Sequence, residues 1–258
     1  MKSFSVLALD DFPIVEADDD LSRMIVEASI KNGLSLKNGD IIVIAQKVIS
    51  KSEGRIAKLS SVKASEKARE IGQMAKKSGK LVELVLRETR RILKISSEAL
   101  IVRDSRGLIS INAGIDKSNV KGRDSYALLP MNPDSSAEKC RCEIKELTGK
   151  DVAVVISDTY SRPFRRAQVN FAIGIAGIGP FKDYRGTKDL FGQVLRVKRA
   201  AIVDEIAAAA ELLMGQGTEA TPVIIIRGLQ CLVESCGTCS INELYLSDEE
   251  DMFRGLAQ

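Results

Sequence analysis

The chain of 258 residues carries 38 Lys and Arg against 35 Asp and Glu, and it contains no histidine. The lack of histidine excludes catalytic triads, general bases and zinc sites built on that residue. The net charge of +3 does not call for nucleic acid or a membrane, and an aromatic content of 4% offers little for stacking on single strands. A hydrophobic content of 45% fits a soluble globular protein.

The sequence contains no apolar run near the roughly 20 residues of a membrane span, and its N-terminus lacks the apolar core of a signal peptide. Five cysteines, an odd number, fit a reducing compartment. We therefore expect a cytoplasmic protein with neither a membrane nor a nucleic-acid partner. Cys231, Cys236 and Cys239 could form a thiolate metal site, although free or buried thiols are the default expectation.

The first half of the chain alternates apolar runs with polar, charged segments. The pattern predicts a helix that begins after Asp18–Asp20 and ends at Gly33, a buried strand over 41–45, a polar turn over 46–51, helical segments over 63–78 and 81–93, and a hairpin of 101–102 with 108–111.

The second half opens on a loop over 117–134. It continues with a helix from the capping box Ser135–Glu138 to Gly149, a strand over 152–156, an apolar glycine-rich segment over 171–179, a helix over 200–214 and a strand over 222–226.

Strands and helices alternate in this prediction without a regular βαβ period, which favours a mixed α+β fold over a doubly wound sheet. We treat residues 1–258 as one unit, within which the glycine and proline-rich segments offer places for a boundary between two subdomains. The chain has no glycine-rich loop of the P-loop type, and the spacing of Gly174, Gly177 and Gly179 differs from the dinucleotide fingerprint.

Two carboxylates follow apolar, β-branched runs, where ligand sites of α/β proteins often lie. Asp116 comes after the strand of the predicted hairpin and Gly114, and Asp158 comes with Thr159 after the strand over 152–156. Each could be a turn or capping aspartate that satisfies nearby amides. Each could equally be a ligand of Mg²⁺ or Mn²⁺, because these hard cations prefer carboxylate and hydroxyl oxygen.

Cationic side chains accompany these carboxylates. Arg162, Arg165 and Arg166 follow Asp158 closely, and their donor forks suit phosphate or carboxylate, although such a cluster can also be a solvated surface. Lys47 and Lys51 follow the strand over 41–45 and are either surface lysines or phosphate contacts. Together the carboxylates and cations indicate a metal and phosphate site. The first interpretation of Gly215–Gly217 is a turn that caps the C-terminus of the preceding helix. Its backbone could also approach a ligand closely, because glycine has no side chain.

Nine short motifs occur together in one order along the chain. They are residues 48–55 (VISKSEGR), 112–116 (NAGID), 134–138 (DSSAE), 158–159 (DT), 164–166 (FRR), 171–174 (FAIG), 188–192 (KDLFG), 204–207 (DEIA) and 213–217 (LMGQG). In this set the chain resembles the coenzyme F-420-0:gamma-glutamyl ligase family, from about residue 8 to about residue 250. The ordered set is far more specific than any one of its members.

The resemblance implies a two-domain α+β fold, unlike Rossmann or P-loop folds, that forms an intertwined homodimer. It implies a ligase that uses GTP as co-substrate and Mg²⁺ or Mn²⁺, two ions in all, with K⁺ as a further candidate ion. Such a ligase joins L-glutamate to the terminal carboxylate of the deazaflavin precursor F-420-0 and then adds a gamma-linked glutamate, in coenzyme F-420 biosynthesis. The carboxylate would pass through an acyl phosphate.

The resemblance also assigns residues. It implies that Asp116 and Asp158 hold metal, with Thr159 and Gln216 at a second ion. It implies a GTP pocket lined by Phe12, Pro13, Ile14, Val15, Gln46, Lys47, Lys51, Asn119, Met214, Gly215, Gln216, Gly217, Thr218 and Glu219. Asp116, Asp158, Arg165 and Arg166 form the expected catalytic set, in which the arginines bind phosphate or carboxylate groups.

Two alternatives remain open at this point. A related nucleotide- and metal-dependent ligase with another carboxylate acceptor would share these sites but reject F-420-0. The chain could also be a non-catalytic protein that binds anions or nucleic acid through its arginines. Its binding would weaken steeply as the salt concentration rises and would not need Asp116 or Asp158.

Overall fold

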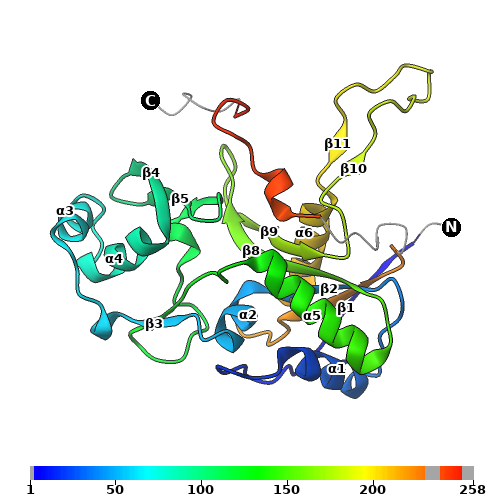
Figure 1. The fold of residues 1–258 in the computed structure, drawn as a ribbon, viewed down its shortest axis with the longest axis horizontal. Coiled ribbons are helices and arrows are strands. Elements are labelled where there is room, and N and C mark those ends of the chain that lie inside the picture. The colour runs from blue at the N-terminus through cyan, green and yellow to red at the C-terminus, as the bar shows by residue number, and fades with distance from the viewer. Residues whose placement is uncertain (1–2, 230–238, 252–258) are drawn as a thin grey trace.

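The computed structural model describes residues 3–229 and 239–251, and a five-stranded mixed sheet lies at its centre (Figure 1). Its strands, in spatial order, are β1 (Ser5–Ala8), β12 (Val223–Arg227), β2 (Ile41–Ala45), β8 (Ala153–Ser161) and β9 (Gln168–Ala176). In this sheet β2 and β8 pair in parallel, and the other neighbours are antiparallel. The expected mixed α+β class is therefore confirmed, and the sheet is not doubly wound.

Helices cover both faces of the central sheet, which is why its middle strands are continuous apolar runs. On one face α1 (Leu21–Lys31), α2 (Gln46–Ser52) and α5 (Pro133–Thr148) pack against Ile42 and Ile44 of β2. On the other face α6 (Ile202–Met214) packs against Ile41 and Val43. Figure 1 shows α1 and α5 side by side below the sheet.

Helix α5 begins earlier than its predicted capping box. Asn132 is the N-cap and accepts a hydrogen bond from the Ser135 backbone N–H at 3.1 Å, and Pro133 occupies the first turn. Proline is favoured there because its missing N–H has no helical partner to lose. The predicted end at Gly149 is confirmed. The N-terminus of α5 lies close to β9, because a Cβ on Gly174 would meet Pro133 at 2.6 Å.

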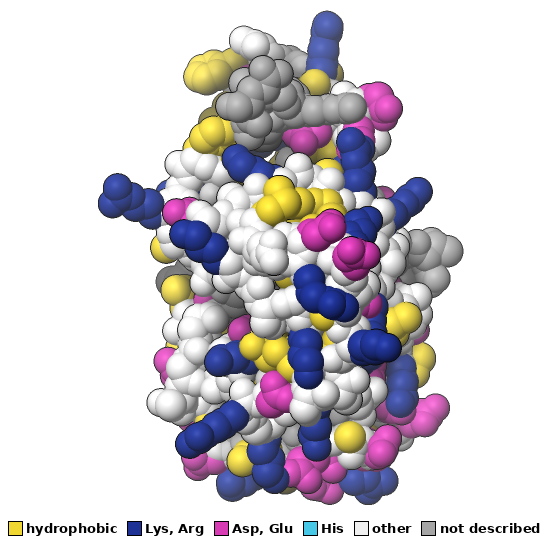
Figure 2. Space-filling view, turned by 90° about the vertical axis from the view of Figure 1, so that its left-hand side faces the viewer, with side chains coloured by type: hydrophobic (Ala, Val, Ile, Leu, Met, Phe, Trp, Pro, Cys, Tyr) yellow, Lys and Arg dark blue, Asp and Glu magenta, His cyan; other side chains and the backbone are white. Residues whose placement is uncertain are grey.

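A second, smaller core forms beside the central sheet. It combines α3 (Glu66–Met74) and α4 (Gly79–Glu88) with an antiparallel sheet of β4 (Thr89–Ile95), β5 (Leu100–Asp104) and β6 (Ile109–Ile111). The predicted hairpin of β5 and β6 is confirmed. The helix expected over 81–93 is wrong after Glu88, because residues 89–95 are strand. On the side of the molecule that Figure 2 shows, Lys and Arg side chains are spread over the surface, with Asp, Glu and scattered apolar side chains among them.

Short elements join the two cores. Strands β3 (Ile56–Lys58) and β7 (Ser125–Ala127) pair antiparallel, so the segment expected as loop over 117–134 contains a strand. Single turns of 3-10 helix are η1 (Leu59–Ser61), η2 (Asn112–Gly114) and η4 (Ile241–Leu244).

A long arm projects from the molecule beyond β10 (Lys182–Asp183) and β11 (Arg199–Ala200), at the upper right of Figure 1. Leu190 is 99% exposed and Phe191 is 90% exposed on this arm. The apolar segment 171–179, in contrast, is largely buried in the chain's own core, and its first six residues belong to β9. The apolar, glycine-rich composition of 171–179 predicts a segment that a partner subunit would cover, and the structure corrects this, because the chain's own core buries it.

In residues 3–229 and 239–251, no helix combines the length and apolar character that crossing a bilayer requires. Cys140 and Cys142 are free thiols. Cys231 and Cys236 lie outside the described residues. Cys239 is disulfide-bonded, which corrects the expectation of a free thiol at that position.

Candidate active site

A cavity of about 990 Å³ opens between the central sheet and the small sheet. Every residue expected to bind GTP or metal lines it: Phe12, Pro13, Ile14, Val15, Gln46, Lys47, Lys51, Asp116, Asn119, Asp158, Thr159, Met214, Gly215, Gln216, Gly217, Thr218 and Glu219. These residues come from five separate parts of the sequence. Strand ends and loops gather them because β2 and β8 run parallel and finish at the same edge of the sheet.

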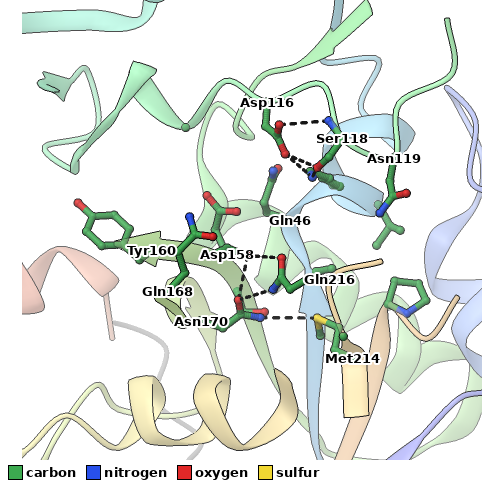
Figure 3. Close-up of a pocket in the computed structure, with 18 of the residues that line it drawn as sticks. Gln46, Asp116, Ser118, Asn119, Asp158, Tyr160, Gln168, Asn170, Met214 and Gln216 are labelled. Carbon is green, nitrogen blue, oxygen red and sulfur yellow. Dashed lines mark hydrogen bonds and ion pairs between the residues drawn. The ribbon is translucent and has the colours of Figure 1, made fainter. Parts of the chain in front are cut away.

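Asp116 occupies the small-sheet side of the cavity and is held by a lysine of α2, the helix that follows β2 of the central sheet. Lys47 Nζ lies 2.5 Å from Asp116 Oδ2, and the Ser118 hydroxyl donates to the same carboxylate (Figure 3). Burial acts to raise the pKa of Asp116, but the hydrogen bonds from Lys47 and Ser118 outweigh it and hold the pKa below its usual value. The carboxylate is therefore charged at neutral pH.

The turn before Asp116 has an unusual backbone. Asn112, Ala113 and Gly114 all have positive φ, at 53°, 55° and 70°. Strained turns of this kind persist where the surroundings fix them. Here the Leu129 side chain packs so closely that a Cβ on Gly114 would meet it at 2.7 Å. Asp116 itself exchanges two backbone hydrogen bonds with Ala127, at 3.2 and 2.8 Å.

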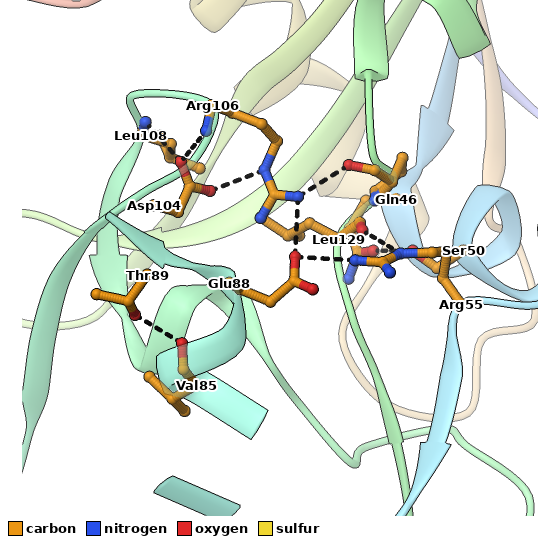
Figure 4. A network of polar contacts seen from close by, with 11 residues as sticks. Gln46, Ser50, Arg55, Val85, Glu88, Thr89, Asp104, Arg106, Leu108 and Leu129 are labelled. Carbon is orange, nitrogen blue, oxygen red and sulfur yellow. Dashed lines mark hydrogen bonds and ion pairs between the residues drawn. The ribbon is translucent and has the colours of Figure 1, made fainter. Parts of the chain in front are cut away.

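A buried group of ion pairs supports the same turn (Figure 4). Arg106 donates to Asp104 Oδ2 at 2.8 Å, to Glu88 Oε2 at 3.2 Å and to the Pro130 carbonyl at 3.1 Å. Arg55 donates to the same Glu88 oxygen at 2.8 Å and to the Leu129 carbonyl at 3.1 Å. Two positive and two negative side chains thus balance in the interior.

These ion pairs connect the parts of the chain that position Asp116. Arg106 lies in the β5–β6 turn, and β6 leads directly into η2 and Asp116. The carbonyls of Leu129 and Pro130 belong to the segment that packs on Gly114 and leads to α5. The network therefore ties the Asp116 turn to the central sheet.

Asp158 approaches from β8, opposite Asp116. It lies within this strand and not after it as expected, because β8 continues to Ser161. Loss of solvation raises the pKa of Asp158 to about 6, against the opposing effects of the Thr159 backbone N–H and the Lys47 charge. A carboxylate in this setting gains from a bound cation, which restores the charged form.

The side chains of Thr159 and Gln216 meet next to Asp158. The Thr159 hydroxyl lies 3.0 Å from Gln216 Oε1 and 3.1 Å from Asn170 Oδ1. The Gln216 amide nitrogen donates to Glu211, and Glu211 Oε2 accepts from the Asn170 backbone N–H at 2.7 Å. This chain of contacts directs the Gln216 oxygen toward β8 (Figure 3).

Both lysines lie on α2, which corrects the expectation of a polar turn over 46–51. Val48 and Ile49 of this helix are buried in the main core, so Lys47 and Lys51 project toward the cavity. Burial, with Lys47 close by, lowers the pKa of Lys51. A lysine in such a position gains from an anionic partner.

The turn that follows α6 lines one end of the cavity. Gly215 has a φ of +67°, and a Cβ there would meet the Glu219 side chain at 2.3 Å. Glu219 accepts a hydrogen bond from the Gly217 N–H at 2.7 Å, and Asn119 donates to the Gly217 carbonyl at 3.1 Å. Phe12–Val15 close this end.

The arginines of the β8–β9 loop do not all reach the cavity. Arg162 lines it, whereas Arg165 and Arg166 are exposed and do not. Their expected catalytic role therefore stays a prediction. Sequence reasoning missed Ser118, Tyr160, Gln168 and Asn170, all of which line the cavity. The alternation of β8 offered a signal for Tyr160, which lies two residues after Asp158 and so on the same side of a regular strand.

The donor atoms at the centre suit a hard divalent cation. Asp116 and Asp158 supply carboxylate oxygens, and Thr159 and Gln216 supply a hydroxyl and an amide oxygen. Among the described residues no three His, Cys, Asp or Glu side chains form a cluster. Mg²⁺ does not need one, because it binds through one or two carboxylates together with water and substrate phosphates. The residues therefore fit such an ion.

Comparison with known proteins identifies a matching family model and several relatives of this chain. The model of the F420-0:Gamma-glutamyl ligase family matches residues 11–228. The coenzyme F420:L-glutamate ligase of Methanothermobacter thermautotrophicus is 41% identical over 253 residues, which cover 97% of this chain and 99% of the relative. Its counterpart in Archaeoglobus fulgidus is 42% identical over 249 residues, 96% of each chain. The chain belongs to the F420-0:gamma-glutamyl ligase family.

Proposed function

We propose that this protein is a GTP- and divalent-metal-dependent ligase that adds L-glutamate to coenzyme F-420-0, in the cytoplasm, as a step of coenzyme F-420 biosynthesis. The observation that supports it best is the meeting of Asp116, Asp158, Lys47 and Lys51 in one cavity of a member of this family. A volume of about 990 Å³ lies at the upper end of small-molecule pockets, so it has room for more than one substrate.

In this proposal GTP enters at the end of the cavity formed by Phe12–Val15 and Met214–Glu219. Backbone groups around Gly215 and Gly217 approach its phosphates, since glycine leaves the main chain accessible. Lys47 and Lys51 neutralise phosphate charge from the edge of β2. Asn119 lies at the same end and offers an amide to the nucleotide.

The reaction needs activation of a carboxylate. An oxygen of the F-420-0 carboxylate attacks the γ-phosphorus of GTP, the bond to the β-phosphate oxygen breaks, and GDP leaves. The amine of glutamate then attacks the acyl carbon, loses a proton and displaces inorganic phosphate. Repetition on the side-chain carboxylate of the added residue gives the gamma link.

Asp116 and Asp158 would hold a divalent cation, with Thr159 and Gln216 at a second, and K⁺ as a further ion. When bound, such ions neutralise the charge that develops on phosphate and carboxylate oxygens. The chain's own part is to keep Asp116 ionised through Lys47 and to direct the Gln216 oxygen through Glu211 and Asn170. Arg165 and Arg166 are proposed to contact anionic groups of bound substrate.

A homodimer is part of the proposal. The projecting arm supports it, because Leu190, Phe191 and Val197 are 88–99% exposed in a single chain. Apolar side chains gathered on a protruding segment are typical of association surfaces.

The test is to incubate the protein with F-420-0, glutamate, GTP and Mn²⁺ and to measure the product mass. A gain of one or two glutamyl residues, dependent on GTP and metal, is expected. Replacement of F-420-0 by other small carboxylic acids tests the alternative acceptor. Glutamylation of such an acid, without reaction of F-420-0, would replace the proposed substrate but retain the chemistry.

A further inference from the structure

The cavity has a second apolar wall that the site described above does not use. Ile101 of β5, with Ile109 and Ile111 of β6, lines it on the side of the small sheet. Ile101 and Ile111 are direct cross-strand partners, so their side chains lie on one face of that sheet. Tyr160 of β8, in the central sheet, and Pro163, in the loop after β8, complete the wall.

This face of the small sheet has an unexpected composition. The other face, with Leu100 and Val102, is buried in the second core. A sheet with one buried face is expected to place polar residues on the other. Instead Ile101 and Ile109 are only partly buried and Ile111 is 41% exposed, all toward the cavity. Open apolar side chains inside a site are covered when a ligand binds.

The aromatic ring in the wall is fixed in place. Tyr160 stacks on Phe171, with ring centroids 5.2 Å apart and an angle of 23° between the planes. Figure 3 shows Tyr160 and Gln168 on one side of Asp158, and Asn119 and Met214 on the other. The carboxylates therefore lie between two ends of different character.

We infer that the wall of Ile101, Ile109, Ile111 and Tyr160 binds the flat deazaflavin ring of the acceptor. The inference rests on the proposed function, which assigns the opposite end to GTP. A planar fused ring presents two apolar faces to isoleucine and tyrosine, and ring stacking against an aromatic side chain adds to this contact. The Gln168 amide, which supplies both a donor and an acceptor, faces the polar edge of the ring.

Glutamate, the remaining substrate, does not match the chemistry of this wall. Glutamate is small and carries two carboxylates, and the three isoleucines offer it neither charge nor hydrogen bonds. The deazaflavin is the one large apolar group among the substrates not assigned to the GTP end. With its ring on this wall, the acceptor reaches toward Asp158 with its carboxylate, and the nucleotide reaches the same point from the other side.

The test is the binding of F-420-0 to Ile111→Glu, followed by the fluorescence of the deazaflavin itself and without turnover. The dissociation constant should rise at least about tenfold, because a charged side chain replaces apolar contact with the ring. Calorimetric binding of a non-hydrolysable GTP analogue with Mn²⁺ should not change. Ile101→Thr, a milder change, should weaken F-420-0 binding in the same selective way and covers the case in which Ile111→Glu does not fold.

Leu93→Glu is the matched control. Leu93 is 39% exposed on β4 of the same small sheet but does not line the cavity, so its variant should bind F-420-0 like the unmodified protein. The inference would be overturned if the Ile111→Glu and Leu93→Glu variants bound F-420-0 with equal affinity. It would also be overturned if Ile111→Glu lost affinity for the GTP analogue but not for F-420-0. An unmodified protein that binds the GTP analogue but no F-420-0 would instead refute the proposed function, and the inference with it.

Discussion

Lys47 Nζ and Asp116 Oδ2 lie 2.5 Å apart, although the two residues are 69 positions apart in the sequence. Lys47 comes from α2 on the central sheet, and Asp116 follows η2 on the small sheet. The pair therefore joins the two sides of the cavity. It also keeps a proposed metal ligand ionised, since the lysine helps to lower the pKa of Asp116 against the effect of burial.

Asp158→Asn should abolish turnover and leave the fold intact. The amide has nearly the same shape but lacks the charge that a divalent ion requires of its ligand. Steady-state assays and circular dichroism measure the two properties. Asp151→Asn is the control, because Asp151 precedes the same strand and forms an exposed ion pair with Lys145. Full activity of Asp158→Asn at saturating metal would show that Asp158 is only structural.

Arg165→Ala and Arg166→Ala should each reduce kcat/KM. The reduction should correspond to a loss of about 1.5–3 kcal/mol in transition-state stabilisation, as expected when a charge-assisted contact to substrate is lost. Lys67→Ala on the exposed face of α3 should stay within about 0.5 kcal/mol of neutral. The comparison decides whether these exposed arginines meet bound substrate. Losses no larger than that of the lysine variant would remove them from the site.

Arg106→Lys should weaken Mn²⁺ binding about tenfold, the low end of the loss expected when groups that position metal ligands are changed, because Arg106 supports the turn that leads to Asp116. Lysine keeps the charge but cannot hold Asp104, Glu88 and the Pro130 carbonyl together as a guanidinium does. Calorimetry with Mn²⁺ and a GTP analogue measures this affinity.

The control for Arg106 is an ion pair with a buried carboxylate at the start of β2, the end of that central strand away from the cavity. Arg227 donates to Asp40 at 2.8 and 2.7 Å, beside the start of β2. Asp40→Asn should lower the melting temperature, because it leaves the partly buried Arg227 guanidinium without its charged partner, but should not change Mn²⁺ affinity. If both variants lose stability and neither loses metal affinity, the Arg106 network has only a structural role.

The protein should be a dimer, and the arm should contribute to its stability. Light scattering at low micromolar concentration should give about twice the chain mass. Replacing Leu190 and Phe191 by serine should shift the equilibrium toward monomer, since both are almost fully exposed in one chain. Ile30→Ser, at a 65% exposed position of α1, is the control. A monomer that is fully active before any substitution contradicts the dimer.

The buried strands and the gathering of the site could be predicted from the sequence. Strands β2, β8 and β12 are continuous β-branched runs, and residues after such runs meet at a sheet edge. The family resemblance then added the residues of the proposed GTP end, among which Phe12–Val15 have no local signal of their own. All of these residues line the cavity.

Other features depend on tertiary structure that local patterns do not contain. The helical period of the apolar residues in 81–93 predicts a helix that continues to Leu93, whereas residues 89–95 form β4. In β4, register shifts in the pairing with β5 change the side to which successive residues point. Helix α2 has no side-chain N-cap, so nothing marked its start. The wall of Ile101, Ile109 and Ile111 could not be predicted, because the sequence does not show that the outward face of this small sheet lines a cavity.

The most direct test of the central claim uses F-420-0 labelled with ¹⁸O in its terminal carboxylate. With glutamate, GTP and Mn²⁺, mass spectrometry of both products should find glutamylated F-420 and one ¹⁸O in the released phosphate. The label moves because the carboxylate oxygen that attacks the γ-phosphate leaves with it when glutamate displaces the acyl phosphate. Folded protein that forms no glutamylated product would contradict the ligase function. Glutamylated product with unlabelled phosphate would contradict the acyl-phosphate route.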